Sequence, residues 1–173
     1  MLFWDIRWKE FEDDICNLNL NQRLNITLAS LESVLINNEE HFKLSINEEQ
    51  KKNIGLALDI LWGKGTKEKG VVVDKLDEYT CLDNESGVND VLMAILFLLN
   101  AEFELTADDT LEVLSYIYQA VLDMEIISLL ESETLESEVQ TMEENNRKCL
   151  EVIDEQLGFL KKIKNGYVVH RRT

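Results

Sequence analysis

The sequence predicts an all-α fold, a single-domain bundle of about seven helices with a long C-terminal helix. Apolar residues recur at steps of three and four along most of the 173 residues, which is the spacing of one face of a helix. The chain contains no proline, so no helix is ended or kinked by one. Only Val71–Val73 favours a strand, and no repeat period is found, which excludes α/β folds and solenoids.

The first predicted helices are defined by apolar stripes, and one of them also by its caps. The first two stripes are formed by Trp4, Trp8, Phe11, Ile15 and Leu18, and by Leu24, Leu28, Leu31 and Leu35. Asn47 and Gln50 form a capping box, which opens a helix that ends before Gly63. Trp62 closes the apolar stripe of this helix, and we expect it to be largely buried. Residues Val72–Tyr79 are predicted as a short helix, because no second strand-like run lies nearby to pair with them.

The later helices follow an acidic loop at Thr80–Gly87. Val88–Leu99 is apolar on nearly all sides, which predicts a helix buried among others. Thr106 is an N-cap followed by two acids, and it opens a helix that reaches Glu125. The last stripe consists of Leu135, Val139, Met142, Leu150, Ile153, Leu157 and Leu160. It predicts one helix of roughly 45 Å that ends near Gly166.

Charge is the first indication of function. The chain has 17 Lys and Arg against 34 Asp and Glu, and residues 101–155 alone hold 16 acids and 2 bases. The net charge of −17 attracts basic proteins, whereas nucleic-acid binding needs a basic surface. Solubility explains the same acidity without any partner. We expect a basic protein partner and no binding to nucleic acid.

Cysteine usage and apolar run lengths indicate a cytoplasmic protein. Cys16, Cys81 and Cys149 are unclustered and each lies beside Ile or Leu, so we expect reduced, buried side chains. The N-terminal residues lack the basic segment and apolar core of a signal peptide. The longest apolar stretch, Val91–Leu99, is under half the length of a membrane span, so no membrane binding is expected.

The sequence contains no pattern typical of catalysis, a cofactor or a metal site. His41 and His170 lack the neighbours of a zinc or di-iron motif, and both are expected to be solvated. Gly63–Thr66 lacks the strand that precedes a phosphate loop and is predicted to be a turn. Placing Gly87 at the invariant glycine of a calcium loop puts Leu82 where the first carboxylate is required. The chain is therefore predicted not to be an enzyme.

Two acid-rich stretches with few or no bases are predicted to bind the partner. The candidate binding residues are Asp77, Glu78, Asp83, Glu85 and Asp90 in the first stretch, and Glu131, Glu133, Glu136, Glu138, Glu143 and Glu144 in the second. A helix N-terminus explains Glu136 and Glu138 without a partner, since its dipole favours acids, but it does not explain the two acids that follow. The basic tail, residues 166–173, is expected to be frayed beyond the last helix.

Two family resemblances extend this reading. Leu58–Trp62, a later helix that contains Leu111–Leu114 and runs to Met124–Glu125, and a final long acidic helix resemble a bacterial all-helical family of uncharacterised function. Size, helicity, acidity and the Trp62 helix end resemble small acidic all-α immunity proteins of bacterial polymorphic and contact-dependent-inhibition toxin systems. That resemblance implies a cytoplasmic, non-catalytic protein that binds a basic toxin domain, often a nuclease, and blocks its active site or substrate groove. The alternative is a helical adaptor or regulator with another protein partner.

Overall fold

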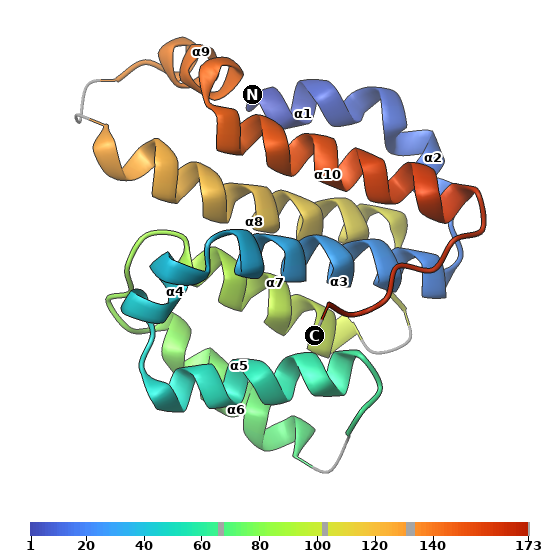
Figure 1. Cartoon of the computed structure of the whole chain (residues 1–173), viewed down its shortest axis with the longest axis vertical. Coiled ribbons are helices and arrows are strands. Elements are labelled where there is room, and N and C mark those ends of the chain that lie inside the picture. Colours follow the sequence, from blue (N-terminus) through green and yellow to red (C-terminus); the bar gives the residue numbers. More distant parts are fainter. Residues whose placement is uncertain (66–67, 102–103, 131–133, 173) are drawn as a thin grey trace.

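The computed structural model, which describes residues 1–65, 68–101, 104–130 and 134–172, is a bundle of helices (Figure 1). All regular elements in these ranges are helical, which confirms the all-α prediction. They are α1 (Phe3–Trp8), η1 (Lys9–Phe11), α2 (Glu12–Cys16), α3 (Leu20–Asn37), α4 (Glu39–Ser45), α5 (Glu48–Leu61), α6 (Lys69–Thr80), α7 (Val88–Ala101), α8 (Ala107–Glu125), η2 (Ile127–Leu129), α9 (Glu136–Asn145) and α10 (Arg147–Lys164), where η marks a 3₁₀ helix. The helices outnumber the roughly seven predicted, because two predicted helices are divided and α4 was not foreseen.

The predicted last helix is divided at Asn146. This residue has φ −91° and ψ 117°, an extended conformation that interrupts the helical backbone. Its side chain accepts a hydrogen bond from the Cys149 N–H at 3.1 Å, which caps the start of α10. The prediction of one helix from residue 135 to 166 is therefore wrong. The apolar spacing continues across the break, so periodicity alone does not reveal it.

Helix α8 lies at the centre of the bundle and packs against α3, α7 and α10 (Figure 1). Its inward side chains are fully buried, namely Val113, Leu114, Ile117, Tyr118, Ala120 and Val121. Helix α7 is buried over most of its surface, as its nearly continuous apolar sequence predicts. This packing fixes the relative positions of α7 and α8, the two helices that form most of the candidate site.

A buried glutamine joins the N-terminal helix to the core. The indole N–H groups of Trp4 and Trp8 donate to Gln156 Oε1 at 2.8 and 3.2 Å. Gln156 Nε2 donates in turn to the carbonyl oxygen of Leu114 at 3.0 Å. One amide thus satisfies two indoles and one helix carbonyl inside the core, where an unpaired polar group would cost free energy.

Helices α5 and α6 pack against each other and against α7. The capping box at Asn47 is confirmed, since Asn47 and Gln50 exchange two hydrogen bonds of 2.9 Å. The helix predicted over residues 72–79 is confirmed by α6. Trp62 follows the last residue of α5 and is only partly buried, so the expectation of a largely buried side chain is wrong. Its Nε1 is nevertheless shielded from solvent and has no hydrogen-bond partner in the described residues.

The basic tail packs against α3 and α5 instead of fraying. The side chain of Asn25 exchanges two hydrogen bonds with the backbone of Val169, at 2.7 and 2.9 Å. The guanidinium of Arg171 contacts Glu32 at 3.0 Å and Asp59 at 2.5 Å. The tail is held because its backbone and its arginine both have specific partners on these helices.

The predictions for cysteine and histidine hold only in part. The three cysteines are free, but only Cys149 is buried, whereas Cys16 and Cys81 are exposed. His170 is exposed as expected. His41 was expected to be solvated, but it is partly buried, and its Nε2 lies 2.8 Å from the carbonyl oxygen of Ser86. This contact links α4 to the loop that precedes α7.

Candidate functional site

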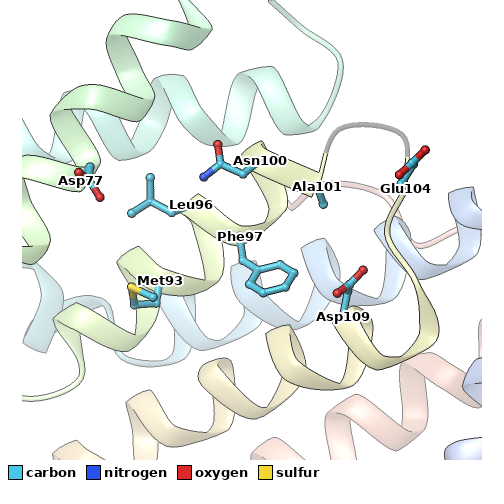
Figure 2. Close-up of a pocket in the computed structure, with 8 residues that line it drawn as sticks. All are labelled: Asp77, Met93, Leu96, Phe97, Asn100, Ala101, Glu104 and Asp109. Atoms are coloured by element: carbon cyan, nitrogen blue, oxygen red, sulfur yellow. The ribbon is translucent and has the colours of Figure 1, made fainter.

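A pocket of about 510 Å³ opens between α6, α7 and α8. Figure 2 shows the residues that line it, which are Asp77, Met93, Leu96, Phe97, Asn100, Ala101, Glu104 and Asp109. Apolar side chains of α7 form its floor, and every ionisable residue among these eight is an acid. A pocket with an apolar floor and a few polar groups at its edge is the usual form of a binding site. The acids at its edge give this pocket a negative potential.

The floor of the pocket comes from one face of α7. Its four principal side chains are spaced at i, i+3, i+4 and i+7, namely Met93, Leu96, Phe97 and Asn100. This spacing places them in one row on the helix surface. Leu96 is buried, Phe97 is half-buried and Met93 is 38% exposed. Exposed methionine and aromatic side chains are enriched in protein interfaces.

The acids come from three different segments. Asp77 lies in the last turn of α6, Glu104 in the connection before α8, and Asp109 in the first turn of α8. A capping box fixes Asp109, because its Oδ2 accepts from the Thr106 N–H at 2.8 Å and its own N–H donates to Thr106 Oγ1 at 3.1 Å. Asp109 therefore keeps one carboxylate oxygen free of the cap.

No base within the described ranges forms an ion pair with Asp77, Glu104 or Asp109. Acids elsewhere do have such partners, in the pairs Arg7–Asp154, Lys43–Glu39, Lys51–Glu48, Lys75–Glu78, Arg147–Glu151, Lys148–Glu125, Lys164–Asp14, Arg171–Glu32 and Arg171–Asp59. Within the described residues, the three pocket carboxylates thus carry negative charge that no ion-pair partner offsets.

The first predicted stretch is divided among different environments. Asp77 lines the acidic pocket, while Glu78 is exposed and pairs with Lys75 at 2.8 Å. Asp83 and Glu85 are exposed as predicted, but they line a second hollow of about 400 Å³. That hollow also includes two exposed leucines, Leu44 and Leu82.

Asp90 was predicted to bind the partner, and it is partly buried at the start of α7. Burial and the neighbouring Asp123 raise the pKa of Asp90 to about 6. Asp123 also accepts a hydrogen bond from the Gly87 N–H at 2.7 Å. Gly87 has φ +80°, and a Cβ there would lie 2.4 Å from the Ala120 carbonyl oxygen, so only glycine fits. Asp90 belongs to the junction between the loop that precedes α7 and helix α8.

The second predicted stretch is largely occupied by structural contacts. Glu131 and Glu133 lie outside the described residues. Glu136 forms an ion pair with the amino group of Met1. Glu138 accepts a hydrogen bond from the Leu135 N–H at 3.0 Å and so caps α9.

The last two acids of that stretch have opposite environments. Glu144 is exposed, and it accepts a hydrogen bond from Gln140 at 3.1 Å. Glu143 is fully buried, although it was predicted to lie on a binding surface. Its carboxylate accepts from the Tyr118 hydroxyl at 2.6 Å and from the Phe3 N–H at 3.2 Å. Glu143 therefore joins α9 to α8 and to the start of α1.

The two predicted stretches lie in different parts of the molecule. In Figure 1, α9 lies at one end of the long axis, and α6 lies at the other end. The described acids of the two stretches therefore form separate acidic regions. Among the described residues, only the first of them contributes to the acidic pocket.

Sequence reasoning missed Glu104, Asp109 and the floor of α7. Asp109 was assigned only to a helix start, and Glu104 has no distinguishing neighbours in the sequence. The row from Met93 to Asn100 could have been found, because a polar Asn at i+7 in an otherwise apolar helix indicates where that helix reaches the surface. What sequence could not show is that α6 and α8 bring acids to that row.

The buried side chains of Cys149 and Tyr118 are poorly suited to act as nucleophiles. Burial raises the pKa of the Cys149 thiol to about 12 and raises the pKa of Tyr118 as well, with Glu143 adding to the shift of Tyr118. Both groups therefore stay protonated near neutral pH, which is unfavourable for a nucleophile. In the part of the chain that is described, no group of three or more His, Cys, Asp or Glu could hold a metal ion.

No described helix is both long and apolar enough to cross a membrane. No family model, curated protein or solved structure matches this chain.

Proposed function

We propose that this protein binds and neutralises a basic bacterial toxin domain, in the manner of an immunity protein. The observation that carries the proposal is the acidic pocket, where Asp77, Glu104 and Asp109 surround an apolar floor and lack ion-pair partners in the described residues. Carboxylates without such partners steer a cationic domain toward the pocket. The apolar floor then supplies the contact area that charge alone does not provide.

The pocket is better suited to a protein than to a small anion or a nucleic acid. Its acids repel phosphate groups, whose recognition requires bases. Its exposed methionine and half-buried phenylalanine are typical of interface centres, where a few apolar anchors supply most of the affinity. A toxin domain that acts on nucleic acid needs a basic groove, so acidic surface is what would block it.

The proposal is tested by co-expressing the protein with the product of its neighbouring gene. We expect a stable complex that survives purification and abolishes the toxicity of that product in cells. A basic partner without toxicity would instead indicate a helical adaptor. The absence of any complex with a basic protein would contradict the proposal.

Charge reversal locates the interface within such a complex. Asp77→Lys with Glu104→Lys should weaken binding at least tenfold, about 1.4 kcal/mol, because two attractions become repulsions. Asp109 is left unchanged since it caps α8. The control is Glu10→Lys with Asp13→Lys, which changes the net charge equally at exposed positions in η1 and α2. Equal losses in the two double variants would show that only net charge matters.

A further inference from the structure

The acidic pocket has two ends of different character. Figure 2 shows Asp77 on α6 at one end, beside Met93 and Leu96, while Glu104 and Asp109 lie at the other end, beyond the ring of Phe97. The apolar row of α7 runs between these two ends. A ligand that satisfies the whole pocket must therefore carry an apolar group in its middle and positive charge toward its ends.

The Phe97 end combines an aromatic ring with two carboxylates. A guanidinium is planar and weakly hydrated, so it stacks on a ring while its N–H groups donate to carboxylates. An ammonium is a compact, strongly hydrated charge that does not present such a flat face. Asp109 is held in place by the Thr106 cap, so its free oxygen is a fixed acceptor at this end.

We infer that the partner inserts an arginine at the Phe97 end of the acidic pocket, with its guanidinium on the Phe97 ring between Glu104 and Asp109. An adjacent apolar side chain of the same partner segment covers Met93 and Leu96, and a second cation reaches Asp77. This inference rests on the proposed function. It specifies a partner segment in which an apolar residue lies between two basic residues.

Three small probes that share an n-butyl chain and differ in the head group test the arginine. They are n-butylguanidinium, n-butylammonium and the neutral n-butylurea, titrated into the isotopically labelled protein and followed by NMR at the Met93 methyl and the Phe97 amide. We expect n-butylguanidinium to bind roughly three- to fivefold more tightly than n-butylammonium, because stacking on a ring favours the planar ion. We expect no shifts with n-butylurea, which carries no charge.

Two variants assign the preference to named residues. Phe97→Leu keeps an apolar floor without a ring, so the guanidinium should lose its advantage over the ammonium while both still bind. Glu104→Gln should weaken both cations. The matched control is Asp83→Asn, which removes one exposed acid at the separate hollow and should leave both affinities unchanged.

The outcomes separate this inference from the proposed function. Equal binding of the two cations would contradict the inference that an arginine of the partner stacks on Phe97. A guanidinium preference that persists in Phe97→Leu would contradict it as well. In that case the toxin complex would still lose affinity in the Asp77→Lys, Glu104→Lys variant, and the proposed function would stand. A guanidinium preference without any basic partner in co-purification would support the pocket chemistry and contradict the proposed function.

Discussion

Two stretches of this chain are almost equally rich in acids, yet the fold uses them in opposite ways. In residues 77–90, Asp77 lines the pocket without an ion pair in the described residues, and Asp83 and Glu85 are exposed. In residues 134–144, Glu138 caps a helix and Glu143 is fully buried. Acid density therefore does not distinguish a surface that attracts a partner from a set of structural contacts. The partners of each carboxylate make that distinction.

Removing Glu143 should have the largest effect. Glu143→Ala leaves the Tyr118 hydroxyl and the Phe3 N–H without their acceptor in the core, so we expect a loss of about 3 kcal/mol in the free energy of unfolding. Denaturant titration measures this loss. Glu144→Ala is the matched control, and it should change stability by less than about 0.5 kcal/mol because Glu144 is exposed. Similar losses of stability in Glu143→Ala and Glu144→Ala would contradict the distinction between a buried structural carboxylate and an exposed one.

Local features of the fold were predictable from the sequence, and long-range ones were not. The capping pairs Asn47 with Gln50 and Thr106 with Asp109 lie three residues apart, so their side chains meet wherever a helix begins. Glu143 is paired with Phe3, which lies 140 residues away. No local pattern encodes such a contact, because it depends on how α1 and α9 meet in the bundle.

The candidate site was predictable only in part for the same reason. Asp77 was selected for its acidic neighbourhood, and it does line the pocket. Glu104 and Asp109 are 27 and 32 positions further along the chain and reach the pocket only because α7 lies between α6 and α8. The break at Asn146 is an intermediate case, since an asparagine N-cap is a local signal that an unbroken apolar stripe concealed.

A smaller effect is expected at Asp90, an acid of the first stretch whose pKa is raised by burial. Its pKa is about 6 in the folded protein and about 4 in an unfolded chain, so the folded state binds this proton more tightly. Ionised Asp90 thus opposes folding above about pH 6, and this cost is lost as the pH falls toward 4. Asp90→Asn should raise stability at pH 7.5 by about 1 kcal/mol, a value reduced for partial exposure.

The pH dependence of that gain is the decisive measurement. The difference in unfolding free energy between Asp90→Asn and the unmodified protein should shrink as pH falls from about 6.5 to about 4, where Asp90 is protonated in the folded state and about half-protonated in the unfolded chain. The control is Asp83→Asn, which removes an exposed acid from the same stretch. A gain of equal size at both pH values would mean that ionisation of Asp90 does not cause it.

The smallest effects should come from the exposed acids of the second stretch, and they complete the contrast with the pocket. Glu138→Ala removes the carboxylate that accepts from the Leu135 N–H, so it should cost about 0.5 kcal/mol as an exposed helix cap. Neither Glu138→Ala nor Glu144→Ala should weaken a complex with a basic partner, whereas Asp77→Lys with Glu104→Lys should. Calorimetric titration of the partner into each variant measures this. If loss of Glu138 or Glu144 weakened binding as much as the pocket reversals, the interface would include α9, and the acids at both ends of the molecule would contact the partner.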